Sequence, residues 1–459
     1  MKSILIPITS NFIVRSFLRT DTLRVLAAEP DVRLVFLAPK GKVDYYRSEF
    51  PGGRIIFDTL PPCASSPVER FFRFVEVAGI HTRTAAIMQR SELFRSGSRK
   101  PLFLRLATFF IKSVLRLLGG FRRWRKFIRG VYLYFPRDVA VAAIFQTYRP
   151  DLVFAPTMLP VDAAFLKEAK KRRIRTAGMV LSWDNLYSKT ILRVHPDLLL
   201  VHTESIKKQA QTLGDYPAER TKVVGIPQYD RHFQKKGVLP REEFIRALGG
   251  DPTKKLIVYA LSGKAGLSIE FDIIEILWRL KESGKITRNT EVLVRSYPRY
   301  DLPPDRLLRI KEKYRFLAEP AMTHIGQGKD SWEFDERSIS LLTNTLAHAD
   351  VIITMYSTFF IEGAAFGKPL IGVAFDGHQN LDFWNSARRF FEWDHLAEIK
   401  PLEGIWLARS GTELAEAVNA YLEDPQHLCE GRSRIVEQQC NFTDGRSGER
   451  AAQALLGIL

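Results

Sequence analysis

The sequence predicts an α/β protein made of two doubly wound domains joined by a hinge. Short β-branched runs alternate with helix-like segments from residue 3 onward, a pattern typical of parallel strands covered by helices. The alternation forms two series, separated by a stretch rich in Lys, Pro and Gly between residues 231 and 252. A chain of 459 residues with 46% hydrophobic side chains is also long enough for two substantial cores.

The first series predicts an N-terminal domain over residues 1–235. Each expected strand is a short apolar run, and each expected helix has longer, mixed composition. The expected strands are Ser3–Ile8, Val32–Ala38, Arg54–Phe57, Asp151–Ala155, Thr176–Leu181, Leu198–His202 and Lys222–Val224; the expected helices are Arg15–Ala28, Val161–Arg173 and Glu204–Leu213.

The second series predicts a C-terminal domain over residues 253–435, after a linker at 236–252. Residues 436–459 are expected to form a C-terminal helix that can pack back on the N-terminal domain. The expected strands are Leu256–Leu261, Glu291–Arg295, Val351–Met355 and Pro369–Val373, and the expected helices are Ile269–Glu282, Pro304–Tyr314 and Ile339–His348.

Charge and cysteine usage narrow the class of protein. The net charge of +17 favours phosphate-rich partners such as nucleotides, anionic lipid or nucleic acid. Cys63, Cys429 and Cys440 are scattered, so we expect neither a disulfide framework nor a zinc site, and a reducing cytosol fits. No run reaches the ~18 to 20 apolar residues of a membrane-spanning helix. The apolar start at residues 1–9 is interpreted as a first strand, not as a signal peptide.

The segment from Asp350 to Ile371 carries the most specific pattern. A buried strand should end at Met355, Ser357 or Thr358 can cap the next helix, and Gly367 can end that helix before Pro369. A helix start at the carboxyl edge of a parallel sheet attracts phosphate through free N–H groups and the helix dipole. Taken locally, the same pattern also fits a capped helix with a solvated glutamate.

This order of a strand, a Ser/Thr pair, an acidic residue and Gly-x-Pro-x-Ile resembles the donor-nucleotide motif of GT-B glycosyltransferases. Within that superfamily the chain is similar to the CDP-glycerol glycerophosphotransferase-like and surface-polysaccharide transferase groups. Supporting segments are Gly225–Asp230, Arg295–Asp301 and Phe442–Arg450, although Tyr297 stands where those groups often have a histidine. The resemblance implies two doubly wound, Rossmann-like domains of GT-B type that face each other across a cleft.

The resemblance also implies roles for individual residues. Ser357, Thr358 and Glu362 would contact the diphosphate and ribose of a nucleotide-activated donor. Arg295 and Lys264 would neutralise the leaving diphosphate, although an ion pair and a solvated turn are the respective alternatives. His378, in the polar segment 376–382, would lie near the donor sugar. GT-B enzymes generally work without an essential metal, so we expect no metal and no cofactor besides the donor, which is a substrate.

The acceptor side needs a group that takes the proton of the acceptor hydroxyl. Asp184 is the first candidate, because Ser182–Tyr187 follows a strand and should project from its carboxyl end. The same residues also fit a structural Asp-Asn turn held by Trp183. Thr9–Asn11 should line the same cleft, whereas the directions of His81 and Asp230 are not fixed by the sequence. No motif of a serine hydrolase, metalloprotease or P-loop protein is evident.

Residues 93–137 form a basic segment with twelve Lys and Arg residues and no acidic one. Without it the net charge would fall from +17 to +5. Its large apolar residues recur every three or four positions from Phe103 to Phe135, which predicts one amphipathic stripe, broken or kinked at Gly119–Gly120. Such a helix can bind an anionic membrane surface; the alternative is a helix pair packed on its own domain.

Together these observations predict a glycosyltransferase that moves a sugar from a nucleotide-activated donor to a glycan or lipid-linked acceptor. It would act in cell-surface polysaccharide synthesis, peripherally on the cytoplasmic face of the membrane and without nucleic acid. A CDP-glycerol-type glycerophosphotransferase is one alternative. A UDP-sugar 2-epimerase-like isomerase is a second, although such epimerases tend to carry Ser-Gly-Gly where this chain has Ser357-Thr358-Phe359. A non-catalytic basic module that binds nucleic acid or membrane is the third.

Overall fold

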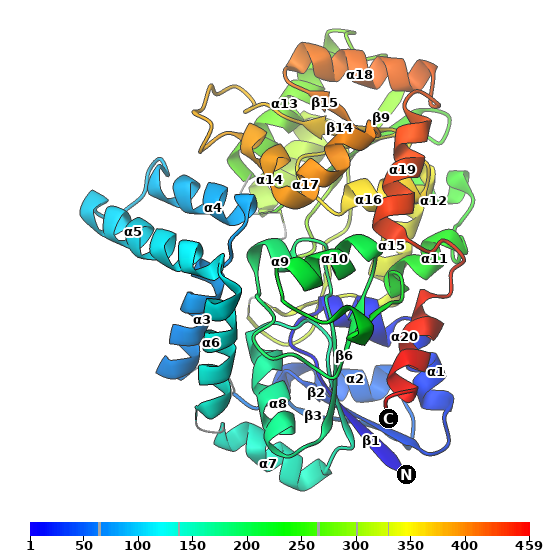
Figure 1. Ribbon diagram of the computed structural model, residues 1–459. Coiled ribbons are helices and arrows are strands. Elements are labelled where there is room, and N and C mark those ends of the chain that lie inside the picture. The colour runs from blue at the N-terminus through cyan, green and yellow to red at the C-terminus, as the bar shows by residue number, and fades with distance from the viewer. Residues whose placement is uncertain (63–65, 136–137, 264–266, 300–301, 329) are drawn as a thin grey trace. The chain divides into compact units, whose positions relative to one another are not determined.

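The chain divides into two compact units (Figure 1), each described here by itself. The computed structural model describes residues 1–62, 66–135, 138–263, 267–299, 302–328 and 330–459. Unit 1 comprises Met1–Asp230, Ile325–Ser331 and Cys440–Leu459, and unit 2 comprises Arg231–His324 and Trp332–Gln439. The change of unit at Arg231 lies close to the boundary expected from composition.

Unit 1 is built on a parallel sheet in the order β3-β2-β1-β4-β5-β6-β7. The order reverses direction between β1 and β4, which is the mark of a doubly wound fold. All seven predicted strands are confirmed to within two residues. They are β1 Lys2–Pro7, β2 Val32–Ala38, β3 Ile55–Thr59, β4 Leu152–Ala155, β5 Arg175–Met179, β6 Leu198–Val201 and β7 Thr221–Val223.

The helices of unit 1 are partly those expected. Helix α8 (Pro160–Lys171) and helix α10 (Glu204–Thr212) confirm two predictions. The continuous helix expected over Arg15–Ala28 is wrong, because the hydroxyl of Thr20 accepts a hydrogen bond from the amide of Thr22 and starts a new helix. The remaining elements are η1 Val14–Leu18, α1 Asp21–Ala28, η2 Lys40–Lys42, α2 Val43–Glu49, α9 Asn185–Ser188, η3 Ala218–Arg220 and η4 Pro227–Tyr229.

The end of the chain completes unit 1. Helix α20 (Ser447–Leu456) packs against α1 (Figure 1), and Ala451 and Leu455 belong to the core beside Leu26. The Asp230 carboxylate accepts hydrogen bonds from the amides of Ser447 (2.9 Å) and Gly448 (2.7 Å) at the start of α20. Asp230, a weaker candidate for catalysis, therefore anchors the C-terminal helix.

A long helical insertion separates β3 from β4 in unit 1. Its helices α3 to α6 extend to one side of the sheet in Figure 1. Helix α5 ends at Gly119 and α6 begins at Arg122, so the break predicted at Gly119–Gly120 is confirmed. The elements are α3 Pro67–Ala78, α4 Arg83–Leu93, α5 Leu102–Gly119, α6 Arg122–Tyr134 and α7 Val139–Tyr148.

In its second half, helix α6, the amphipathic stripe expected over 93–137 packs within unit 1, which is the alternative of a helix packed on its own domain. Ile128 of α6 is buried, and so are the guanidinium groups of Arg125 and Arg129. Both guanidinium groups bind the carboxylate of Asp215, at 2.6 Å from Arg125 and 2.7 Å from Arg129. The pattern of α6 therefore serves packing within unit 1, whereas α5 leaves most of its large apolar side chains exposed.

The end of α5 depends on a close approach of two glycines. A Cβ atom on Gly119 would lie 1.7 Å from the carbonyl oxygen of Gly79, at the end of α3. We expect Gly119→Ala to lower the free energy of unfolding of unit 1 by about 1–3 kcal/mol, because backbone must move to admit the methyl group. Urea unfolding measures this. The control is Gly130→Ala within α6, where a Cβ has nothing within 4 Å; it should raise stability by roughly 0.5–1 kcal/mol. An unchanged midpoint for Gly119→Ala would contradict the close packing.

Unit 2 repeats the doubly wound design with the parallel order β10-β9-β8-β13-β14-β15. The four predicted strands are confirmed, while β10, β15 and the β11–β12 hairpin were not expected; β10, β11 and β12 have only two residues each. The strands are β8 Lys255–Ala260, β9 Thr290–Arg295, β10 Leu317–Ala318, β11 Thr323–His324, β12 Trp332–Glu333, β13 Val351–Thr354, β14 Leu370–Val373 and β15 Trp406–Ala408.

The helices of unit 2 include the three that were predicted. Helix α15 starts earlier than expected, because Asp335 caps it by accepting a hydrogen bond from the amide of Ser338 at 2.8 Å. The helices are α11 Asp230–Phe233, α12 Arg241–Ala247, α13 Leu267–Glu282, α14 Pro304–Leu308, η6 Arg309–Lys313, α15 Glu336–His348, α16 Phe359–Ala365, η7 Ala387–Glu392, α17 Asp394–Ile399, η8 Lys400–Leu402, α18 Gly411–Glu423 and α19 Cys429–Cys440.

Residues 236–252, expected as a linker, pack onto unit 2. The amide of Leu239 donates to the side chain of Asn344 (2.8 Å), and Arg241 forms an ion pair with Asp350 (2.8 Å). Arg241 also donates to the carbonyl oxygen of His348 at 2.6 Å. These contacts with α15 and the start of β13 make residues 236–252 part of unit 2. The Lys, Pro and Gly composition of the segment did not indicate this packing.

Candidate functional site

The corner where β13 meets α16 is the predicted donor site of unit 2. The hydroxyl of Ser357 accepts a hydrogen bond from the amide of Phe359, the first residue of α16, at 3.1 Å, while Thr358 is the N-cap residue and forms no capping hydrogen bond through its side chain. Thr358 is exposed at the same turn. Gly367 ends the helix with a φ of 68°, which confirms its predicted left-handed conformation. The two hydroxyls therefore lie at the carboxyl edge of the sheet, where doubly wound folds bind ligands.

Glu362, one turn into α16, is buried with 3% exposure. Its Oε2 lies 3.8 Å from Nε2 of His232, which is also buried, and the ring of His232 lies 5.1 Å from that of Phe366. His232 belongs to α11, just after the segment Gly225–Asp230. The sequence analysis missed His232, although its place at the end of that segment was a signal. The carboxylate is thus held inside unit 2 beside a titratable ring.

Arg295 ends β9 and is buried next to the same corner. Its guanidinium forms an ion pair with Glu319 and lies 5.6 Å from the ring of Phe359, the first residue of α16. Glu319 also accepts a hydrogen bond from the hydroxyl of Thr345 at 2.7 Å. The ion pair that was the alternative for Arg295 is therefore present, and it places the cation close to the start of α16.

The loop after β8 contributes groups that the sequence did not single out. Lys264 lies outside the described residues. The amide of Ser262 donates to the carboxylate of Glu270 in α13, and burial raises the pKa of Glu270 to about 7. At Gly263, which has a φ of 110°, a Cβ would lie 3.6 Å from the ring of Tyr297. A buried carboxyl group of raised pKa thus holds this loop.

The polar loop after β14 is held by a buried carboxylate. Asp376 accepts hydrogen bonds from the hydroxyl of Ser386 (2.9 Å) and the amide of Ala387 (2.6 Å), which closes residues 377–385 into a loop. His378 is exposed on that loop. Close by, the ring of Tyr356 stacks at 3.8 Å on Phe390, an aromatic contact that the sequence analysis missed. The loop presents His378 at the same edge of the sheet as Ser357.

Asp184 lies on the loop after β5, at the carboxyl edge of the sheet in unit 1. It stands at the N-cap of the short helix α9 (Asn185–Ser188), and its carboxylate forms an ion pair with Lys189 at 2.8 Å. Trp183 beside it is buried. Asp184 is therefore partly exposed at the carboxyl end of its strand, where it was predicted to project, and it also belongs to the Asp-Asn turn that was the alternative. His81 lies elsewhere: its Nδ1 is 2.9 Å from the carbonyl oxygen of Arg116 in α5.

The loops after β1 and β4 are joined by the buried carboxylate of Asp162. It accepts hydrogen bonds from the amide (2.7 Å) and hydroxyl (2.6 Å) of Thr157, from the amide of Met158 (2.9 Å) and from the hydroxyl of Thr9 (3.3 Å). Asn11 of the same edge accepts a bond from Lys42 at 2.9 Å. Thr9 and Asn11, predicted to line this edge, are thus positioned by side chains that the sequence analysis did not identify.

Asp162 should make stability depend on pH. Burial raises its pKa to about 6, above the roughly 3.9 of an unfolded aspartate. The folded state is therefore penalised as the pH rises from about 4 through 6, by about 3 kcal/mol in all. Relative to Asp162→Asn, the wild-type free energy of unfolding, measured in urea, should fall by about that amount between pH 4 and pH 7. A constant difference between the two proteins would contradict this assignment.

Among the residues that the structure describes, no group of three or more His, Cys, Asp or Glu side chains is arranged to hold a metal ion.

A buried histidine, His202, follows β6 at the same edge of unit 1 as Asp162, and burial lowers its pKa to about 4. His202 is therefore neutral at physiological pH.

No protein-family model and no curated protein matches the chain. Among solved structures, it is similar to UDP-GlcNAc 2-epimerase from Neisseria meningitidis bound to UDP-GlcNAc, at 12% identity and a TM-score of 0.55, with 100% of both chains covered. A glycosyltransferase from Rickettsia africae matches at 12% identity and 0.50, covering 99% of this chain and 98% of that one. The wall teichoic acid polymerase TagF matches at 10% and 0.50, covering 100% and 88%. The chain has the GT-B fold, with two Rossmann-like domains, as predicted.

Proposed function

We propose that the protein is a GT-B glycosyltransferase that moves a sugar from a nucleotide-activated donor to a glycan or lipid-linked acceptor. The observation that carries this proposal is the corner of unit 2, where Ser357 and Thr358 lie at the start of α16 with Arg295 beside them. Similar folds belong to proteins whose names include a glycosyltransferase, a 2-epimerase bound to UDP-GlcNAc and a teichoic acid polymerase.

In the proposed reaction, the bond between the sugar's anomeric carbon and the donor phosphate breaks as the acceptor oxygen bonds to that carbon. The proton of the acceptor hydroxyl passes to a base, for which Asp184 is the candidate. The leaving diphosphate gains negative charge, which the hydroxyls of Ser357 and Thr358 and the guanidinium of Arg295 would stabilise. Glu362 would accept hydrogen bonds from the ribose, and His378 would contact the sugar. In this proposal the donor and the acceptor are the substrates, and neither a metal nor a cofactor takes part.

A thermal-shift panel of CDP-, UDP-, GDP- and CMP-activated donors tests the proposal. One class should raise the unfolding temperature, because a ligand at 100 times its Kd stabilises the folded state by about 2.7 kcal/mol. A protein that responds to no activated nucleotide would contradict the proposal. The activated nucleotide that raises the unfolding temperature most then identifies the class of donor. A largest increase with CDP-glycerol would favour the glycerophosphotransferase alternative.

A UDP-sugar 2-epimerase is the second candidate, favoured by the similarity to UDP-GlcNAc 2-epimerases over the full chain. Against it stands Ser357-Thr358-Phe359, where a Ser-Gly-Gly start of the helix would be expected. Incubation of the donor without any acceptor separates the two reactions. An epimerase interconverts two nucleotide sugars under these conditions, whereas a transferase needs an acceptor to release nucleoside diphosphate.

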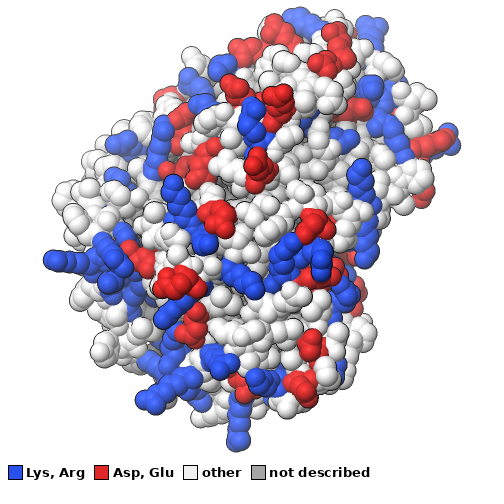
Figure 2. Space-filling model, turned by 45° about the vertical axis from the view of Figure 1, so that its right-hand side comes forward, with Lys and Arg blue, Asp and Glu red and all other residues white. Residues whose placement is uncertain are grey.

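We further propose that the protein works on the cytoplasmic face of a membrane, bound peripherally through residues 93–137. Over the described residues, no helix has both the length and the apolar character needed to cross a bilayer. On the face shown in Figure 2, Lys and Arg residues are interspersed with Asp and Glu, so the excess of positive charge, +17 over the whole chain, does not form one patch on this face. The acid-free stretch 93–137 supports membrane attachment, since it adds apolar surface to its charge.

A further inference from the structure

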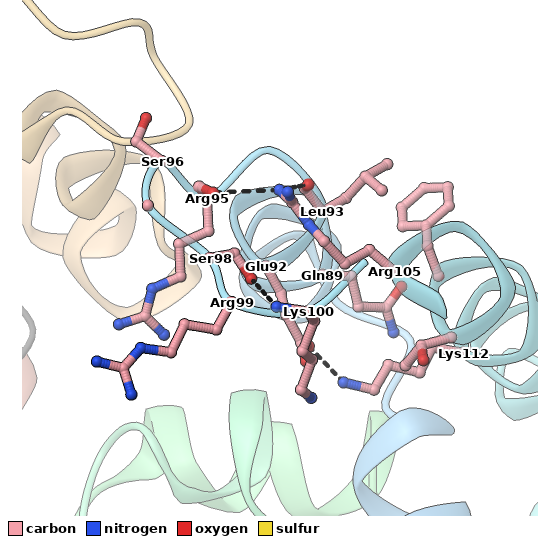
Figure 3. A pocket seen from close by; sticks show the side chains of 13 residues that line it. Gln89, Glu92, Leu93, Arg95, Ser96, Ser98, Arg99, Lys100, Arg105 and Lys112 are labelled. Atoms are coloured by element: carbon pink, nitrogen blue, oxygen red, sulfur yellow. Dashed lines mark hydrogen bonds and ion pairs between the residues drawn. The ribbon is translucent and has the colours of Figure 1, made fainter. Parts of the chain in front are cut away.

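A basic cavity lies between helix α4 and the first half of helix α5 in unit 1 (Figure 3). Its volume is about 440 Å³, within the range of small-molecule sites. The loop that connects the two helices forms part of its wall. The charged residues that line it are Glu92, Arg95, Arg99, Lys100, Arg105 and Lys112.

Three of these charged side chains build the wall of the cavity. The ammonium group of Lys112 pairs with the carboxylate of Glu92 at 2.5 Å. The guanidinium of Arg105 turns back to the loop, where it donates to the carbonyl oxygens of Leu93 and Arg95, the latter at 3.2 Å (Figure 3). Glu92, the acidic residue of the lining, is thereby already neutralised.

The other three cations are available to a ligand. Arg95, Arg99 and Lys100 are exposed, and within the described parts of the chain none of them forms an ion pair with a carboxylate. In Figure 3 the side chains of Arg95 and Arg99 extend away from the carbonyl oxygens that hold Arg105. Guanidinium groups bind phosphate oxygens in bidentate geometry. The cavity therefore has the charge and the donors for a phosphate group.

Helix α5, which forms one wall of this cavity through Arg105, Phe109 and Lys112, also exposes large apolar side chains on other parts of its surface. Phe103 is 68% exposed, Phe110 is 70% exposed and Leu117 is 57% exposed, along a helix that the structure describes in full and in which only Gly119 is buried. Phe71 of the neighbouring α3 is 60% exposed. Exposed apolar surface of this extent marks an interaction site. A partner that binds both this cavity and α5 must therefore offer apolar groups as well as phosphate.

We propose that the cavity binds the phosphate headgroup of an anionic phospholipid while α5 lies in the headgroup and acyl boundary of the bilayer. A phospholipid supplies both requirements in one molecule. A nucleic acid would satisfy the cations but leave the aliphatic residues of α5 in water. The inference depends on the membrane attachment proposed above and is independent of the reaction that the protein catalyses.

Sedimentation of the full chain with phosphatidylcholine vesicles, with and without phosphatidylglycerol, tests the inference. The cavity variant is Arg95→Gln, Arg99→Gln and Lys100→Gln combined. Its matched control removes three exposed cations of unit 1 that lie outside residues 93–137 and do not line the cavity, through Arg73→Gln, Lys208→Gln and Arg220→Gln. A third variant, Phe103→Ser with Phe110→Ser, removes apolar surface from α5. Thermal unfolding checks that all variants fold.

We expect the wild type to bind the anionic vesicles more tightly than the neutral ones. The cavity variant should lose roughly 100-fold in affinity, since a cation near an anionic surface contributes about fivefold to tenfold. The control variant should lose less than about tenfold in affinity for the anionic vesicles. The α5 variant should lose about tenfold or more in affinity for both vesicle types.

Equal losses in the cavity and control variants would mean diffuse attraction and would overturn the headgroup site alone. Wild-type protein that does not bind anionic vesicles, or that binds single-stranded RNA more tightly than these vesicles, would overturn the membrane proposal too. Neither result bears on the donor site, which the nucleotide panel tests separately.

Discussion

Replacing Arg193 by Met should lower the free energy of unfolding of unit 1 by about 3–5 kcal/mol, the largest stability effect expected in this protein. Arg193 is fully buried between two glutamates of α3, with Glu69 at 2.9 Å and Glu76 in direct contact. Lys167 also approaches Glu69, at 3.3 Å, so the cluster holds two cations and two anions. Loss of Arg193 leaves a carboxylate buried without its cation.

The cluster joins the helical insertion to the sheet domain, so its loss should be seen first in α3. Hydrogen exchange of the peptide 67–78 should speed up in Arg193→Met, because local opening no longer breaks a buried ion pair. The double variant with Glu76→Gln should regain part of the stability, since it removes the uncompensated charge. The control is Arg246→Met, in an exposed pair with Glu242 at 2.6 Å, with an expected change within about 0.5 kcal/mol. Equal effects at both arginines would show that the cluster does not stabilise the fold.

Replacing Glu362 by Ala should weaken binding of the nucleoside diphosphate about 10- to 100-fold, the largest effect on ligand binding expected from a single substitution. The range corresponds to the loss of a hydrogen bond to a charged group, roughly 1.5–3 kcal/mol. Glu362 is buried beside His232 in unit 2, so its carboxylate is already positioned before a ligand arrives. Isothermal titration with the nucleotide identified by the donor panel measures the change.

The control for this experiment is Glu416→Ala, an exposed glutamate on α18. It removes the same charge from the same unit and should leave the affinity unchanged. Because Glu362 is buried, the thermal unfolding of each variant must be recorded as well. A folded Glu362→Ala variant with wild-type affinity would remove this residue from the donor site.

The positions of most strands along the chain were predictable because most of the longer strands have a continuous buried run. Strands β1, β2 and β13 are apolar at nearly every position, as parallel strands covered on both faces must be. The short strands β10 and β15 lack such a run and were missed. The break of the helix at Thr20 was also missed, since the apolar period of Val14, Phe17 and Leu18 continues without a visible interruption.

The candidate site was predictable only where local sequence decides the structure. Ser357 and Gly367 follow from capping rules, which act within a few residues. His232 beside Glu362, Glu319 beside Arg295 and Thr9 beside Asp162 are contacts between segments far apart in the chain. The same limit applies to residues 93–137. The apolar period of this segment was visible in the sequence, but the ion pairs of Arg125 and Arg129 were not, because their partner Asp215 lies 86 residues or more away in the chain.

A crystal structure of the protein with the preferred nucleoside diphosphate tests the central claim most directly. We expect the diphosphate within hydrogen-bonding distance of Ser357 and Thr358, the ribose against Glu362 and the guanidinium of Arg295 on the phosphate side. A nucleotide bound away from the start of α16, with these side chains unchanged, would contradict the assignment of unit 2 as the donor-binding unit.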